Sequence, residues 1–117
     1  MPKILIVDDN ARMRGMLKAM VADLATGVIE CQDGKDALAA YEANHPDVVL
    51  MDISMKEMDG LAATQQIVTA DPAARIIIVT NFDDDAMRQA AQAVGARGYI
   101  LKENLLEVRQ HLQALAT

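Results

Sequence analysis

The stretch Val48-Val49-Leu50-Met51-Asp52 is an uninterrupted apolar run that ends in a carboxylate. A short run of this kind predicts a strand that is buried on both faces. Three more apolar runs are followed at once by chemically capable polar groups. These are residues 4–7 before Asp8 and Asp9, residues 76–78 and Val79 before Thr80, and residues 99–101 before Lys102.

Around these runs, strand and helix patterns alternate five times. The first helical segment carries apolar residues with the spacing of an amphipathic helix, and we expect Met13, Met16 and Met20 to fill the core. Alternating βα units predict a parallel sheet with helices on both faces. We expect strands over 3–8, 28–31, 48–52, 75–80 and 98–101, and helices over 11–24, 36–43, 60–70, 83–94 and from 104 onward through an inward Leu115.

The polar strand ends also predict the order of the strands. Neighbouring strands lie about 4.8 Å apart, so the four polar ends can share one pocket only if their strands are contiguous. The second predicted strand, which ends at Cys31 without such a group, then lies outside. The sequence thus predicts an α/β fold, a (βα)₅ doubly wound parallel sheet of five strands in the order 2-1-3-4-5. Five units are too few for an eight-stranded barrel, so an open sheet is expected.

Length and composition narrow the protein's class. A chain of 117 residues favours one domain, here residues 1–117. The single cysteine excludes an internal disulfide and a cysteine-based metal site. No targeting or membrane-spanning segment is visible, which favours a cytoplasmic protein. The net charge of −6, with no basic patch, argues against direct binding to nucleic acid or membrane. We expect Arg12, Arg14 and Lys18 to be solvated, and His45 and His111 to lie in solvent.

The predicted pocket brings together Asp8, Asp9, Asp52, Thr80 and Lys102. Two carboxylates about 4 Å apart repel by about 4 kcal/mol at an effective dielectric constant of about 20. Lys102 offsets part of this repulsion, and Mg²⁺, which prefers oxygen ligands, is the cation that fits the rest. A carboxylate beside Mg²⁺ and an ammonium suits phosphoryl transfer, in which the carboxylate itself can become an aspartyl phosphate.

Several motifs, in order and at matching intervals, resemble the receiver domain of two-component response regulators. They are Val7-Asp8-Asp9-Asn10, the stretch from Met51-Asp52 to Met58-Asp59-Gly60, Thr80, and Gly98 to Lys102. The resemblance covers the whole chain and implies the flavodoxin-like fold of CheY-like proteins. Residues 95–99 are similar to receivers that precede a DNA-binding output domain of the LuxR/NarL type, which implies a role in transcription regulation.

The resemblance implies a role for each residue. Asp52 would accept a phosphoryl group from a histidine kinase or a phosphotransfer protein. Asp9, Asp52 and the backbone carbonyl of Ser54 would bind Mg²⁺, and Asp8 would act mainly through a water. Lys102 would pair with the phosphoryl group, while Thr80 and Tyr99 would switch the surface of the fourth helix, fifth strand and fifth helix. That surface would control an output domain, a protein partner or a homodimer, and the chain would be no enzyme beyond its own phosphorylation and dephosphorylation.

Two positions depart from the family pattern. Lys56 stands where a proline is usual, so its loop loses a fixed φ and gains a cation. Asn81 stands where a small residue is usual, and we expect it to slow access to Asp52.

Other interpretations remain open at this point. A pseudo-receiver would bind proteins without taking phosphate, although it would usually lack one of the acids or the lysine. A phosphatase of the haloacid-dehalogenase type would need Asp-x-Asp after the first strand, where this chain has Asn10. Away from the pocket, Asn10, Asp59, Asn104 and the acids at 83–85 are typical of helix N-termini, Gly95 of a helix end, and Asp33-Gly34 of a turn. Cys31 is expected to be buried.

Overall fold

A computed structural model describes residues 1–115, except for the side chain of Leu115, so the predicted inward position of that side chain lies outside the described residues. Five parallel strands form one sheet in the order β2-β1-β3-β4-β5, as predicted. The strands are β1 (Lys3–Val7), β2 (Gly27–Cys31), β3 (Val48–Met51), β4 (Ile76–Thr80) and β5 (Gly98–Leu101). The helices are α1 (Ala11–Val21), α2 (Ala37–Asn44), α3 (Gly60–Ala70), α4 (Asp85–Ala93) and α5 (Leu106–Leu115), with 3₁₀ turns at Ala22–Leu24, Gly34–Asp36 and Lys102–Asn104.

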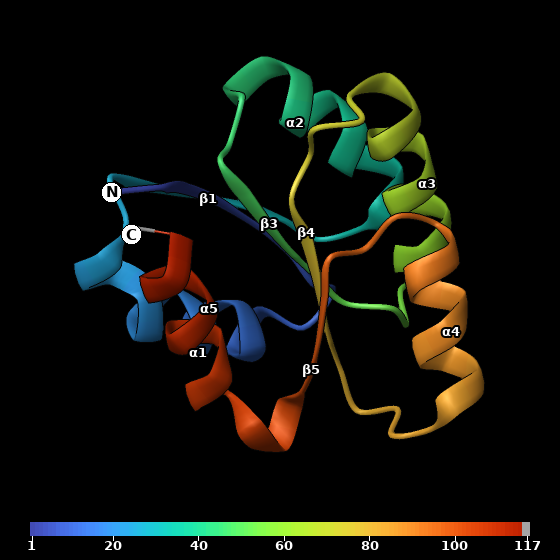
Figure 1. Ribbon diagram of the computed structural model, residues 1–117. Coiled ribbons are helices and arrows are strands. Elements are labelled where there is room, and N and C mark those ends of the chain that lie inside the picture. Colours follow the sequence, from blue (N-terminus) through green and yellow to red (C-terminus); the bar gives the residue numbers. More distant parts are fainter. Residues whose placement is uncertain (116–117) are drawn as a thin grey trace.

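The sheet is the middle of three layers (Figure 1). Helices α1 and α5 cover one face, and α2, α3 and α4 cover the other. The central strands β1, β3 and β4 are buried on both faces, whereas β2 at the edge is only partly buried. Each covering layer closes its own hydrophobic core, one centred on Leu17, Val108 and Leu112 and the other on Ile67, Ala63 and Tyr41.

Two helices begin at predicted capping side chains, Asn10 and Asp59, and a third begins at Asp84, one of the three acids predicted at the start of the fourth helix. Asn10, Asp59 and Asp84 each accept a hydrogen bond from the backbone N–H three residues further on. This satisfies one of the amides that a helix start leaves unpaired. The fourth helix is shorter than predicted, because Asp84 is its cap. Asn104 lies within a 3₁₀ turn instead of capping α5, which begins at Leu106.

Predictions for four further single residues agree with the structure in two cases and differ from it in two. Gly95 follows α4 with φ of 102°, the left-handed conformation predicted for a helix end. Cys31, predicted to be buried, is only partly so because it lies on the edge strand. Its partial burial raises the pKa of the thiol. His45 is exposed as predicted, whereas the ring of His111 is half-buried, close to the backbone of Gly98 on β5.

The methionines of α1 differ from the prediction in one case. Met13 and Met20 pack against the core, but the side chain of Met16 is 49% exposed. Helix α1 meets the sheet mainly through Leu17 and Val21, which are buried, so Met16 lies at the border of the apolar stripe. Within residues 1–115, no helix is both long and apolar enough to cross a membrane.

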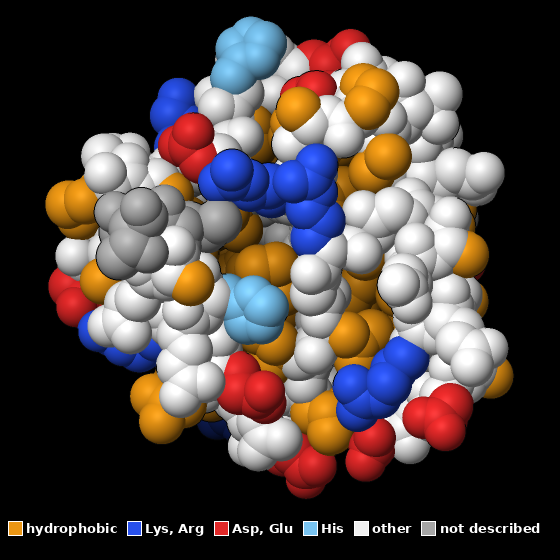
Figure 2. All heavy atoms as spheres, viewed as in Figure 1, with side chains coloured by type: hydrophobic (Ala, Val, Ile, Leu, Met, Phe, Trp, Pro, Cys, Tyr) orange, Lys and Arg blue, Asp and Glu red, His pale blue; other side chains and the backbone are white. Residues whose placement is uncertain are grey.

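The face of the molecule drawn in Figure 2 carries basic, acidic and hydrophobic side chains that are interspersed.

Candidate functional site

The predicted polar groups meet at the carboxyl edge of the sheet. Asp8 and Asp52 directly follow β1 and β3, whose last residues pair in register, and Lys102 directly follows β5. Thr80 is the last residue of β4, between them. The contiguous strands β1, β3, β4 and β5 thus bring the four ends to one place, as the sequence predicted.

Three carboxylates form the centre of this site. One carboxylate oxygen each from Asp8, Asp9 and Asp52 lies within 4.8 Å of the others. Asp8 and Asp52 are 1% and 5% exposed, whereas Asp9 is on the surface. Burial, reinforced by the charge of Asp8, raises the pKa of Asp52 to about 6 even though Lys102 opposes the shift. The cluster is therefore a concentration of negative charge with one open side.

Lys102 is the cation built into this cluster. Its Nζ lies 3.0 Å from Asp8 Oδ2 and 3.2 Å from Asp52 Oδ1, and its side chain is 12% exposed. Burial by itself would lower the pKa of Lys102, but hydrogen bonding and the charges of Asp8 and Asp52 outweigh it, so the pKa is raised. One ammonium faces three carboxylates, and the imbalance favours a further cation.

The donor set of this cluster fits a divalent cation that prefers oxygen. Asp8 Oδ1 accepts a hydrogen bond of 2.9 Å from the backbone of Asn10. Asp8 Oδ2 is buried, and its partner is the Lys102 ammonium at 3.0 Å. A buried carboxylate oxygen with spare acceptor capacity, beside two further carboxylates, matches the ligand preference of Mg²⁺.

The loop between β3 and α3 carries Ser54 at the surface, two residues after Asp52. Both ends of this loop are held together, because Gly60 N–H donates to Ile53 O at 2.9 Å. A Cβ on Gly60 would lie 1.8 Å from the carbonyl oxygen of Asp52, so only glycine allows this close approach. A hollow of about 380 Å³ borders Asp9 and this loop, and Lys56 lines it.

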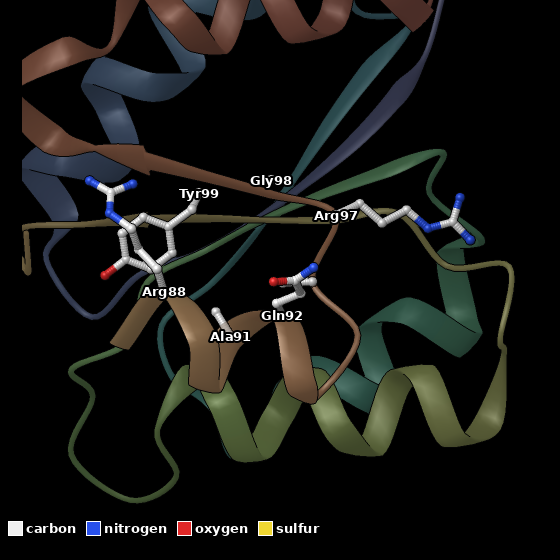
Figure 3. A pocket seen from close by; sticks show the side chains of 7 residues that line it. Arg88, Ala91, Gln92, Arg97, Gly98 and Tyr99 are labelled. Atoms are coloured by element: carbon white, nitrogen blue, oxygen red, sulfur yellow. The ribbon is translucent and has the colours of Figure 1, made fainter. Parts of the chain in front are cut away.

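Thr80 and Tyr99 contact the same residue of the β4–α4 loop. Thr80 is buried, and its Oγ1 accepts a hydrogen bond of 3.2 Å from Phe82 N–H. The hydroxyl of Tyr99 donates to Phe82 O at 2.6 Å. Figure 3 shows the Tyr99 ring beside Arg88 of α4, whose guanidinium lies 4.7 Å from the ring centroid. The backbone of Phe82 thus joins two residues predicted to move together, while Asn81 is exposed next to it.

Two residues near the site were missed or misread in the sequence. Arg14, expected to be solvated, donates to Asp8 O at 2.7 Å and pairs with Glu30, which fixes the chain after β1. Asp33, expected only in a turn, is 6% exposed and accepts hydrogen bonds from the β3–α3 loop. An Asp-Gly pair indicates the turn, but no local pattern indicates partners that are 24 and 25 residues away.

Comparison with known proteins gives one consistent match. The family described as response regulator receiver domain matches residues 4–113. The chemotaxis protein CheY of Listeria monocytogenes is 41% identical over 103 residues, which are 87% of this chain and 87% of that protein. The transcriptional regulatory protein YdfI of Bacillus subtilis is 37% identical over 113 residues, which are 95% of this chain and 53% of that protein.

A solved structure agrees with these sequence matches. A LuxR-family two-component response regulator from Aurantimonas sp. SI85-9A1 has a TM-score of 0.90 and 30% identity, covering 97% of this chain and 84% of that chain. The strand order, the acidic cluster at the carboxyl edge and the extent of the sequence matches all lead to the same conclusion: the chain belongs to the receiver domains of two-component response regulators, which are signalling proteins.

Proposed function

We propose that Asp52 accepts a phosphoryl group from a histidine kinase or a phosphotransfer protein in a Mg²⁺-dependent reaction. The observation that carries this proposal is the position of Lys102 Nζ in the acidic cluster, within 3.2 Å of carboxylate oxygens of both Asp8 and Asp52. A cation beside a carboxylate nucleophile stabilises the charge of a transferring phosphoryl group.

The metal ligands in this proposal are Asp9, Asp52 and the backbone carbonyl of Ser54, with Asp8 acting mainly through a water. Bound Mg²⁺ would neutralise charge on the phosphoryl oxygens and allow the anionic donor to approach. A pKa of about 6 leaves Asp52 mostly ionised at neutral pH, so the nucleophile needs no separate base. The neighbouring Asp8 Oδ2, which is paired with Lys102, would supply a further acceptor for the hydrated ion.

In the reaction, a carboxylate oxygen of Asp52 forms a bond to phosphorus while the bond from phosphorus to the donor's histidine nitrogen breaks. The electron pair of that bond stays on the imidazole. Lys102 is already placed beside Asp52 Oδ1 and would pair with a phosphoryl oxygen. Hydrolysis of the aspartyl phosphate requires water to attack phosphorus while the bond from phosphorus to the Asp52 oxygen breaks, and Asn81 in the exposed β4–α4 loop would hinder the approach of that water.

The signal would pass through Thr80 and Tyr99. A phosphoryl group on Asp52 offers a new partner to the Thr80 hydroxyl, which now accepts from Phe82. Movement of Thr80 would disturb the Phe82 backbone, and with it the hydrogen bond of Tyr99. The α4–β5–α5 surface would then change for an output domain, a partner protein or a second copy, in the manner of a two-state switch.

The wider setting of this switch is also part of the proposal. Residues 1–117 would act as one receiver domain in the cytoplasm. A link to a DNA-binding output of the LuxR/NarL type is suggested by similarity to such a regulator, but CheY proteins are similar over a comparable share of the chain. A pseudo-receiver, which takes no phosphate, is the alternative. The presence of all three acids together with Lys102 favours a receiver that is phosphorylated.

The test is incubation with acetyl phosphate, with and without MgCl₂, followed by intact-mass measurement. We expect a mass gain of one phosphoryl group on the wild type, dependent on Mg²⁺ and lost in Asp52→Asn. Exposed Glu42→Gln on α2 removes the same charge far from the site and serves as the control, which should be phosphorylated normally. No gain on the wild type would favour a pseudo-receiver, and turnover of phosphate esters would favour a phosphatase.

A further inference from the structure

Strand β2 contributes no group to the acidic cluster, yet the loop after β2 holds the loop after β3. The carboxylate of Asp33 is 6% exposed and accepts three backbone N–H groups. One comes from Lys35 in its own turn, at 3.0 Å, and the others from Glu57 at 3.0 Å and Met58 at 3.1 Å. These hydrogen bonds, with the one from Lys35 foremost, hold the pKa of Asp33 below its usual value.

Two more contacts join the same loops. A Cβ on Gly34 would lie 2.4 Å from the carbonyl oxygen of Met58, so the backbones of the two loops are in direct contact here. Lys35 also forms an ion pair with Glu57, but both side chains are more than half exposed. An exposed pair of this kind contributes little to stability, so the buried carboxylate of Asp33 is the main connection.

The position of this connection along the β3–α3 loop gives it a consequence. The loop's ends are joined by the hydrogen bond from Gly60 to Ile53, and Asp33 holds residues 57 and 58 between them. Lys56 leaves φ free at this point of the loop, because among the amino acids only proline fixes that angle. The middle of the loop is therefore held by hydrogen bonds from outside it and not by its own covalent stiffness.

We infer that Asp33 is a positioning residue for Mg²⁺ binding, since it fixes the β3–α3 loop, which carries the proposed ligand carbonyl of Ser54 two residues after Asp52. This rests on the proposed function, in which that carbonyl is a ligand. Asp33 does not itself bind the ion. Its part resembles that of groups behind a metal site, which orient the ligands and whose loss weakens affinity by about 10–100-fold.

The test is the dissociation constant for Mg²⁺, measured by following backbone amide resonances of residues 52–60 during titration with MgCl₂. Asp33→Ala removes all three acceptors, and we expect binding to weaken by about tenfold, at the lower end of that range. Asp33→Asn keeps the oxygen that can accept from Lys35 and Met58 and loses only the acceptor for Glu57. We expect it to bind with an affinity between those of the wild type and the alanine variant.

Asp71→Ala is the matched control. Asp71 also accepts a side-chain and a backbone hydrogen bond, from Tyr41 and Ala73, and it lies before β4 at the opposite edge of the sheet. Its loss should lower stability without changing Mg²⁺ affinity. Hydrogen exchange provides a second readout. The amides of Glu57 and Met58 should exchange faster in Asp33→Ala, only that of Glu57 in Asp33→Asn, and neither in Asp71→Ala.

The outcomes separate the two proposals. If the wild type binds no Mg²⁺, the proposed function fails and this inference with it. If the wild type binds and Asp33→Ala binds equally well while its loop amides exchange faster, only the positioning role is overturned. Should the alanine variant fail to fold, an asparagine variant with unchanged Mg²⁺ affinity and faster exchange at Glu57 would overturn it equally.

Discussion

Replacing Asp52 with asparagine is expected to stabilise the protein when no divalent cation is present. The carboxylate is 5% exposed and lies next to that of Asp8. Burial and the charge of Asp8 raise its pKa from 3.8 to about 6, although Lys102 acts in the opposite direction. Asparagine has nearly the same shape and no charge, so it removes the cost of keeping this group ionised in the folded state.

The magnitude and the pH dependence both arise from this difference in pKa. A pKa shift of about 2 units corresponds to about 3 kcal/mol between the two protonation states. Because the pKa is raised in the folded state, the folded protein binds the proton more tightly than the unfolded chain does. The stabilisation of the folded state by the proton on Asp52 is complete below pH 3.8 and is lost as the pH rises to about 6. Above that pH, we expect the variant to be more stable by about 1–3 kcal/mol.

Urea denaturation in EDTA measures this difference, with far-UV circular dichroism as the signal because the chain has no tryptophan. The control is Glu42→Gln, which removes one negative charge from an exposed position. The urea midpoint of Asp52→Asn should exceed those of the wild type and of Glu42→Gln at neutral pH and approach them at about pH 4. A variant that is no more stable than the control at neutral pH, or a gap that persists at low pH, would refute the reasoning. Excess MgCl₂ should narrow the gap by stabilising the wild type.

Two further predictions concern a close backbone contact beside the site and a hydrogen bond at the opposite edge of the sheet. Gly60→Ala places a methyl group 1.8 Å from the carbonyl oxygen of Asp52, so the backbone must shift. We expect the free energy of unfolding in urea to fall by about 3 kcal/mol and phosphorylation to be impaired. A variant as stable as the wild type would contradict the close approach. Tyr41→Phe removes the hydrogen bond of 2.7 Å from the buried tyrosine to Asp71 and should cost about 1 kcal/mol at neutral pH. Because that bond lowers the pKa of Asp71, its stabilisation is present above pH 3.8 and should fade as acid protonates the carboxylate, so a loss that does not change with pH would contradict it.

The sheet order and the gathering of Asp8, Asp9, Asp52 and Lys102 at one edge could be predicted from the sequence, because both depend on where apolar runs end. An apolar run that stops at Asp52 or Lys102 indicates where a strand ends and which polar group lies at that end. Parallel strands whose polar ends share one pocket must be neighbours. This gives the order 2-1-3-4-5, which the structure confirms.

The features that could not be predicted depend on contacts between distant segments. The partners of Asp33 are determined by the path of two loops, which periodicity does not describe. Met16 has helical spacing but lies at the border of the apolar stripe, and spacing alone does not give the angle at which a helix rests on a sheet. Arg14 has the composition of a solvated residue, and only the fold shows that Asp8 O and Glu30 lie within its reach.

The connection between Thr80 and Tyr99 has a consequence for which residues position 82 can tolerate. Both hydrogen bonds use the backbone of Phe82, its N–H on one side and its C=O on the other. Its side chain, 40% exposed, takes no part in them. Most substitutions there should leave the link between the two strands intact, and proline, which has no N–H to donate, should cut it on the Thr80 side alone. The two hydrogen bonds therefore constrain the peptide geometry at position 82 and leave the choice of its side chain free.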